Sequence, residues 1–268
     1  MGIMKGKKGL VVGVANERSI AWGIAQALHR EGAELAFTYL NDSLKKRVKP
    51  LAEGIGSKLV LPCDVGSDDD IKEVYKELEK EWGGLDFLVH SVAFANKDEL
   101  KGAFYNTSRD GFALALDISA YSLVAMTREA LPLMEGRNAS IITLTYYGAE
   151  KVIPNYNVMG VGKAALETSV RYLAADLGSL GHRINAISAG PVRTLAAAGI
   201  GDFRKIQRVN ELRTPMQRLV TLEEIGNTAL YLCSDHSTGM TGEVMHVDCG
   251  FHAMALSVQE AQQLSSKD

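Results

Sequence analysis

Short apolar runs alternate with longer amphipathic segments along almost the whole chain. Apolar runs of strand length occupy residues 9–14, 33–39, 58–62, 85–90, 139–144, 183–188 and 243–248. Segments of helical period occupy residues 19–31, 68–82, 108–134, 156–180, 202–213 and 222–234, the third being interrupted only near Pro132. Strands that alternate with helices are typical of a parallel sheet with helices on both faces. The pattern therefore predicts an α/β protein with a doubly wound (Rossmann-type), seven-stranded parallel sheet.

The length predicts a single domain, and the composition argues against a nucleic-acid-binding protein. The chain has 268 residues, of which 46% are hydrophobic and 23% charged, with a formal charge of −3. A sheet of this size buries a sufficient core without disulfides or metals, and a slightly acidic chain lacks the basic surface that nucleic acids require. We expect a single domain over residues 1–256 and a polar tail over residues 257–268.

The cysteines and histidines form no metal-binding or disulfide pattern. Cys63, Cys233 and Cys249 are odd in number and lack CxxC spacing, and the six histidines are scattered. This usage predicts no metal and a reducing, cytoplasmic compartment. The apolar run after the basic residues 1–8 is too short for a signal peptide or a membrane span, so no membrane association is expected.

Candidate binding residues follow the predicted strands, whose carboxyl ends meet at one edge of the sheet. Gly13 ends the first strand and Ser19 precedes the next helix. Backbone N–H groups and the helix dipole make such a turn an anion site that suits a pyrophosphate. The glycines do not match GxGxxG, so this signal is weak alone. The Ser19 hydroxyl either meets a phosphate or simply caps its helix.

The second and third strands end at Leu40 and at Asp64, where a dinucleotide fold reads the adenosine. An arginine at position 40 would suit a 2′-phosphate, but the first basic residues here are Lys45, Lys46 and Arg47 on the next helix. Leucine at position 40 therefore predicts that the protein uses NADH rather than NADPH as its cofactor. Asp64 either accepts a hydrogen bond from the adenine amine or is a turn residue.

The fourth strand ends at His90 and leads into Ser91-Val-Ala-Phe-Ala95. Small side chains at positions 93 and 95 would let a nicotinamide ring and a thin acyl chain approach the backbone. His90 lies in an apolar run, which favours a hydrogen-bonded core histidine over a catalyst.

Tyr156 and Lys163 follow the fifth strand at a spacing of seven residues. In a helix that spacing corresponds to about 700°, about 20° short of two turns, and to roughly 10 Å along the axis. Such a pair could hold a ribose between them, the ammonium binding the sugar and polarising the phenol toward an oxyanion. Taken alone, the same residues could be surface neighbours.

The segment after the sixth strand is apolar and contains glycine. Residues 195–201 are small or apolar and lead into a helical pattern. This region, about 194–210, is either a lid over an apolar substrate or a buried connection. Arg204, Lys205 and Arg208 then form either a solvated basic face or a docking surface for an acidic partner.

With these residues assembled, the chain resembles the divergent branch of the short-chain dehydrogenase/reductase superfamily formed by the bacterial NADH-dependent enoyl-acyl-carrier-protein reductases. The resemblance extends from Gly6 to about Phe251. It is carried by Gly13 with Ser19-Ile20-Ala21, by Asp64-Val65, by residues 90–95, by Tyr156 with Lys163, and by residues 185–196. The six residues between Tyr156 and Lys163 are the most specific mark, because most of the superfamily has three.

The resemblance implies an enzyme that saturates trans-2-enoyl thioesters on acyl carrier protein with NADH, in the last step of fatty-acid elongation, and that is a homotetramer. The implied catalytic residues are Tyr146, Tyr156 and Lys163. The implied cofactor contacts are Gly13, Ser19, Ile20, Leu40, Asp64, Val65, Val92, Lys163, Val192, Arg193, Thr194, Leu195 and Ala196. The implied substrate contacts are Ala95, Tyr146, Tyr156, Met159, Ile200 and Phe203. Leu40 departs from the glutamine of the NADH-using relatives. Alternatives are a related reductase of enoyl-CoA or carbonyl compounds, and a non-catalytic dinucleotide sensor.

Overall fold

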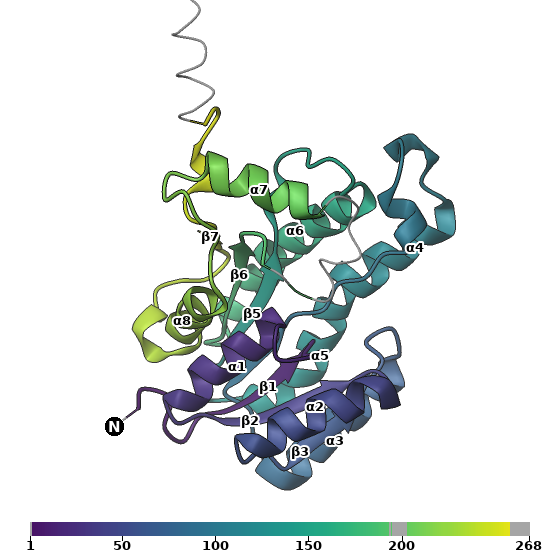
Figure 1. Cartoon of the computed structure of the whole chain (residues 1–268). Coiled ribbons are helices and arrows are strands. Elements are labelled where there is room, and N and C mark those ends of the chain that lie inside the picture. The colour runs from purple at the N-terminus through teal and green to yellow at the C-terminus, as the bar shows by residue number, and fades with distance from the viewer. Residues whose placement is uncertain (1, 193, 195–202, 258–268) are drawn as a thin grey trace, which may run out of the picture.

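A seven-stranded parallel sheet forms the centre of the computed structural model, which describes residues 2–192, 194 and 203–257 (Figure 1). Of residues 203–206 it describes the backbone alone. The strand order is β3-β2-β1-β4-β5-β6-β7. The strands are β1 (Lys8–Val12), β2 (Glu34–Tyr39), β3 (Leu59–Pro62), β4 (Phe87–His90), β5 (Ser140–Thr145), β6 (Arg183–Ala189) and β7 (Val244–Val247). The order reverses between β1 and β4, so the predicted doubly wound fold is confirmed.

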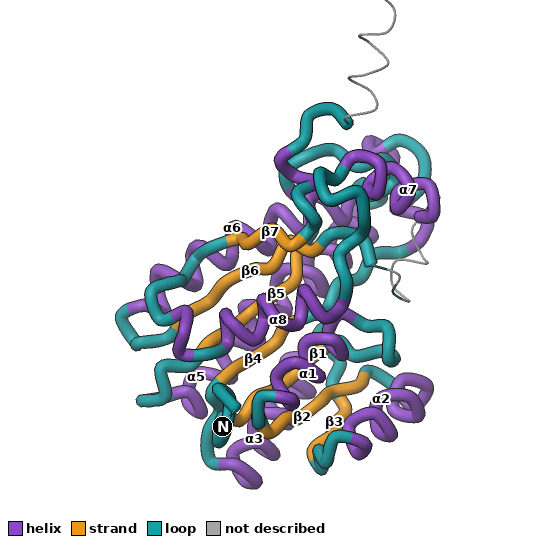
Figure 2. Tube along the Cα trace, turned by 60° about the vertical axis from the view of Figure 1, so that its left-hand side comes forward, coloured by secondary structure: helices purple, strands orange, loops and turns teal. Residues whose placement is uncertain are grey.

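Helices cover both faces of the sheet (Figure 2). They are α1 (Ile20–Arg30), α2 (Asp42–Gly54), α3 (Asp68–Trp82), α4 (Arg109–Leu116), α5 (Ser122–Met134), α6 (Val158–Gly178), α7 (Phe203–Arg213) and α8 (Leu222–Cys233). One hydrophobic core joins α1, α2 and α8 to the sheet, and a second joins α3, α5 and α6 to its other face. Because both faces are covered, β4, β5 and β6 are buried at every position.

Local sequence signals fix several helix ends. The Ser67 hydroxyl accepts a hydrogen bond from the Asp70 N–H at the start of α3, and Gly83 ends that helix in the left-handed conformation at φ 62°. Thr221 and Glu224 form a capping box at the start of α8. Because neighbouring strands pair in parallel, their carboxyl ends lie at a common edge of the sheet.

The long helix expected over residues 108–134 is interrupted in a different place. A π-helical turn, Asp117–Tyr121, separates α4 from α5, whereas Pro132 lies inside α5 without ending it. Pro132 is two residues from the end of α5, so it removes only one hydrogen bond from the last turns. The π turn widens the helix where the Ser122 hydroxyl donates to the Ile118 carbonyl at 2.7 Å.

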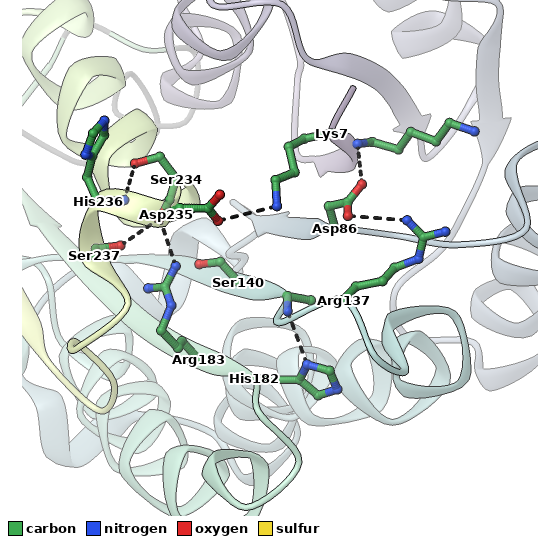
Figure 3. A network of polar contacts seen from close by, with 12 residues as sticks. Lys7, Asp86, Arg137, Ser140, His182, Arg183, Ser234, Asp235, His236 and Ser237 are labelled. Atoms are coloured by element: carbon green, nitrogen blue, oxygen red, sulfur yellow. Dashed lines mark hydrogen bonds and ion pairs between the residues drawn. The ribbon is translucent and has the colours of Figure 1, made fainter. Parts of the chain in front are cut away.

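The amino end of the sheet carries a network of paired polar groups (Figure 3). The Asp86 carboxylate accepts from the Lys8 N–H at 2.8 Å and from the Arg137 guanidinium at 3.3 Å. Arg183 donates to the carbonyls of Leu232, Ser234 and Met240 at 3.0, 3.2 and 3.4 Å. These bonds tie the start of β1 to the residue before β4, and β6 to the end of α8. In the part of the chain described, no helix is long and apolar enough to cross a membrane.

Candidate active site

The turn after β1 approaches the turn after β4 very closely. Gly13 has φ 105°, a conformation that side chains rarely adopt, and a Cβ there would collide with the carbonyl of Ser91. Only glycine permits this approach of two loops at the point where strand order reverses. Gly13 and the amino end of α1 thus form the narrow turn that the sequence predicted for a pyrophosphate.

Ser19 organises that turn. Its hydroxyl oxygen accepts hydrogen bonds from the N–H groups of Ala15 at 2.9 Å and Asn16 at 3.0 Å. The side chain makes no bond to the first turn of α1, so it is not an ordinary helix cap. Both bonds use the oxygen as acceptor, which leaves the hydroxyl hydrogen to donate to an anion.

The adenosine edge is more open. Leu40 follows β2 and is 54% exposed, and the Lys45 ammonium lies 5.4 Å from the centre of the Tyr39 ring. Asp64 is exposed and accepts from the Gly66 N–H at 2.9 Å. Asp64 is therefore a turn residue in this structure, and its contact with adenine stays a prediction. The neighbouring Val65 packs against the core.

His90 is a core residue, as its apolar surroundings predicted. Its side chain is fully buried between the hydroxyls of Thr143 at 2.9 Å and Ser122 at 2.8 Å. Burial, and then the charge of Lys163, lower the pKa of His90 to about 3. The imidazole is therefore neutral at physiological pH and holds β4 against β5.

The loop after β4 is fixed by Ser119 from the π turn. The Phe94 N–H donates to the Ser119 hydroxyl at 3.0 Å, and this hydroxyl donates back to the Phe94 carbonyl at 3.2 Å. The same hydroxyl lies 3.9 Å from the Met159 sulfur. Ser119 thus positions the residue next to Ala95 and links it to α6.

A separate apolar cluster brings four of the predicted substrate residues together. Tyr156 and Met159 are buried in it, and Ala95 and Tyr146 pack against them. The two tyrosine rings meet edge to face, with centres 5.0 Å apart and planes at 74°. The predicted contact residues Ile200, Arg193, Leu195 and Ala196 lie outside the described residues, as does the side chain of Phe203.

Tyr156 precedes helix α6, so the helical spacing argument does not apply to it. The helix begins at Val158, after a turn in which Asn155 and Asn157 have φ values of 63° and 39°. Asparagine tolerates this left-handed region, which lets the chain turn before the helix starts. The Tyr156 ring instead packs on Gly148, where a Cβ would collide with it. The turn, not two helical turns, sets the position of the phenol relative to Lys163.

Lys163 lies inside α6 and is only 6% exposed. Its ammonium donates to the carbonyl of Leu144, at the carboxyl end of β5, at 2.7 Å. Burial lowers the pKa of Lys163 to about 8, against the opposing effect of the Glu167 carboxylate. The side chain therefore lies at the sheet edge and loses its proton at a lower pH than an exposed lysine does.

Both tyrosines are neutral hydrogen-bond donors. Burial raises the pKa of Tyr146 to about 12. Burial also raises the pKa of Tyr156, with Tyr146 and Glu167 adding to the effect. Lys163 is not among these causes, and the polarisation of the phenol by the lysine stays a prediction. The Tyr146 hydroxyl is buried and has no hydrogen-bond partner among the residues described.

Sequence reasoning missed four residues that build this site: Ser119, Thr145, Gly148 and Glu167. Thr145 donates to Glu167 at 2.7 Å. The signals were weak but present. Gly148 follows the Tyr146-Tyr147 pair, and Glu167 stands one helical turn after Lys163.

The residues present fit a dinucleotide. Gly13 and the amino end of α1 suit a pyrophosphate, and Lys163 suits a ribose. Ile20 and Val192 pack against one hydrophobic core, and Val92 packs against the core on the other face of the sheet. The Thr194 N–H donates to the Val192 carbonyl at 2.8 Å. Among the described residues, no group of three His, Cys, Asp or Glu side chains could hold a metal ion.

Comparison with known proteins agrees with this geometry. Residues 13–252 match a family model described as enoyl-(acyl carrier protein) reductase. An NADH enoyl-[acyl-carrier-protein] reductase of Aquifex aeolicus is 57% identical over 98% of this chain and 97% of its own.

Two solved structures share the fold closely. A Bacillus cereus enoyl-acyl carrier protein reductase with NADP⁺ and indole naphthyridinone has a TM-score of 0.93 at 52% identity, covering 96% of this chain and 100% of its own. An Anaplasma phagocytophilum reductase in complex with NAD has a TM-score of 0.91 at 52% identity, covering 96% and 95%. The chain therefore belongs to the enoyl-acyl-carrier-protein reductase family.

Proposed function

We propose that this chain reduces the trans-2 double bond of enoyl-acyl-carrier-protein thioesters with NADH, the last step of bacterial fatty-acid elongation. One observation carries the proposal at the level of the site. The buried Tyr146 hydroxyl has no partner in the described part of the chain, and its ring packs on Tyr156 in an apolar cluster beside the strand ends. An apolar wall with neutral phenol donors suits an acyl thioester.

The chemistry assigns a separate task to each residue. When bound, NADH would supply the hydride for the β-carbon of the enoyl group. The negative charge left on the thioester oxygen is then discharged as the α-carbon takes a proton from solvent. Tyr156 donates a hydrogen bond to that oxygen as the charge develops, and its raised pKa keeps the proton on the phenol. Tyr146 presents the second hydroxyl to the same apolar site. Lys163 binds the nicotinamide ribose and orients the cofactor.

Three substrates separate this function from its alternatives. With purified protein and NADH, absorbance loss is followed with an enoyl thioester on acyl carrier protein, with crotonyl-CoA and with a ketone. We expect the carrier-protein thioester to give the highest kcat/KM. Faster turnover of the ketone would indicate a carbonyl reductase, and no turnover of any substrate would indicate a dinucleotide sensor.

The acyl carrier protein would dock beside the region 194–210, which we propose as the substrate lid. Support comes from the basic residues Arg204, Lys205 and Arg208 in the sequence of α7, of which Arg208 is exposed and pairs with Glu211 at 3.3 Å. If this face binds an acidic carrier, Arg204→Glu with Lys205→Glu raises KM for the carrier-protein thioester and spares the CoA thioester. Equal loss on both substrates would contradict docking.

We also propose a single catalytic domain over residues 1–256, a homotetramer and a cytoplasmic location. Large side chains exposed on α4, the π turn and α6, and just after α6, support the oligomer; they are Phe112, Tyr121, Tyr172 and Leu180. The three cysteines are free, which suits a reducing compartment. Light scattering on the purified protein tests the tetramer, and a monomer would contradict it.

A further inference from the structure

A buried carboxylate lies one helical turn from the active-site lysine. Glu167 is 7% exposed and stands four residues after Lys163 on α6. Residues at this spacing lie on the same face of a helix. The chemistry described above assigns no task to Glu167, although a buried acid is costly to maintain.

Two consecutive residues of β5 hold this pair. The Leu144 carbonyl accepts from the Lys163 ammonium at 2.7 Å, and the Thr145 hydroxyl donates to the Glu167 carboxylate at 2.7 Å. The end of one strand thus sets the position of both charged side chains, which lie one helical turn apart on the same face of α6.

The charge of Glu167 offsets the cost of burying Lys163. Burial removes water from the ammonium and lowers the pKa of Lys163, while Glu167 raises it. Among the described residues, Glu167 is the charged group that acts in this direction. His90, which also feels the Lys163 charge, is neutral.

Other charged groups act on Glu167 itself. Burial raises the pKa of Glu167, and the Thr145 hydrogen bond lowers it. Glu150 raises this pKa further, while Arg171 and His246 lower it. Glu150 and His246 pair with each other at 2.6 Å, so their effects on Glu167 offset one another in part.

We propose that Glu167 is a positioning residue for Lys163, keeping its ammonium charged and aimed at the cofactor ribose. This inference rests on the proposed function, because it assigns the ribose to Lys163. Glu167 does not touch the reacting atoms and acts through the lysine alone.

The sign of the pH effect follows from this role. NADH affinity is full while Lys163 is protonated and falls as pH rises through the lysine pKa of about 8. Glu167→Gln removes the charge that raises this pKa, so the fall in affinity moves to lower pH. A shift of about one pH unit gives about tenfold weaker binding above both midpoints.

Fluorescence titration of NADH from about pH 6.5 to about pH 9.5 tests the proposal. We expect Glu167→Gln to bind like wild type at the acid end and about tenfold more weakly at the alkaline end. The variant Lys163→Met gives the NADH affinity that remains when the lysine ammonium is absent. Asp176→Asn removes an exposed carboxylate from the same helix and serves as the matched control, with an unchanged midpoint. An unmoved midpoint in Glu167→Gln, or equal weakening at every pH, would overturn the proposal.

Thr145→Val provides a second variant if Glu167→Gln does not fold. It removes the hydrogen bond that favours the ionised carboxylate, so the midpoint should move in the same direction by a smaller amount. A wild-type midpoint in this variant would also contradict the proposal. Because binding is measured without substrate, a failure of enoyl reduction in wild type remains distinguishable from a failure of this inference.

Discussion

The buried polar groups at the two ends of the sheet differ in their number of hydrogen-bond partners. At the amino end, each carbonyl that Arg183 contacts has a second donor. Leu232 also accepts from Ser140 and Ser237, Ser234 from Ser237, and Met240 from Asn185. At the carboxyl end, the Tyr146 hydroxyl has no partner in the described part of the chain, and Lys163 makes one bond.

This difference separates stability from function. A buried polar group without a partner costs about 1–3 kcal/mol, and a ligand that supplies the missing bond would remove that cost. At the amino end, each of these carbonyls keeps a hydrogen-bond donor when one donor is lost. The polar groups at the carboxyl end have no second partner of this kind. Substitutions there should change NADH binding and kcat far more than they change the free energy of unfolding.

The largest effect is expected for Tyr156→Phe at the carboxyl end. Loss of one donor to a developing oxyanion should lower kcat by about 10- to 1,000-fold. NADH affinity should stay near wild type, because the phenol acts on the substrate. Steady-state kinetics and NADH titration measure both, and an unchanged kcat would contradict the role of this hydroxyl.

Gly13→Ala should act mainly on the cofactor. The substitution adds a Cβ that collides with the Ser91 carbonyl at a φ of 105°. Strain of about 1–3 kcal/mol corresponds to about 5- to 150-fold weaker NADH binding if the turn moves. Gly54→Ala, in open space, is the control. Normal NADH affinity in Gly13→Ala would show that this turn does not bind the pyrophosphate.

The open adenosine edge predicts a preference for NADH. A 2′-phosphate beside Leu40 finds no arginine at that position, although Lys45 lies near the end of β2 against Tyr39. We expect kcat/KM to favour NADH by about tenfold or more. Equal or better use of NADPH would mean that Lys45 or Lys46 reaches the phosphate.

Arg183→Met, at the amino end of the sheet, should have the smallest effect on catalysis. It therefore tests whether this end serves stability and not function. Loss of its charge-assisted bonds should lower the free energy of unfolding by about 1–3 kcal/mol. The rate constant kcat should stay within about twofold of wild type, because the carbonyls keep their other donors. Urea unfolding and steady-state kinetics provide the comparison. A large loss of kcat at full stability would contradict the separation of the two ends.

The sequence predicted the fold well because alternating apolar runs and amphipathic segments report directly on a parallel sheet. The doubly wound, seven-stranded parallel sheet and the core position of His90 are confirmed. Pro132 misled because proline near a helix end removes little, while the π turn over Asp117–Tyr121 has no comparable sequence signal.

The site was harder to derive than the fold. Asn155 and Asn157 mark the turn that excludes Tyr156 from α6, but isolated asparagines in an amphipathic pattern do not reveal a helix start. The bonds that position Lys163 and Glu167 come from β5, about 20 residues earlier in the chain. Contacts between distant residues are not encoded in any local pattern, so they became visible only in the folded structure.

The most direct test of the central claim is the fate of the transferred hydrogen. NADH carrying deuterium in both positions at C4 is used with an enoyl thioester on acyl carrier protein, and the saturated product is examined by NMR. Hydride transfer at the carboxyl end of the sheet predicts cofactor deuterium on the β-carbon and a solvent hydrogen on the α-carbon. Deuterium on an alcohol carbon, or none in the product, would contradict enoyl reduction at this site.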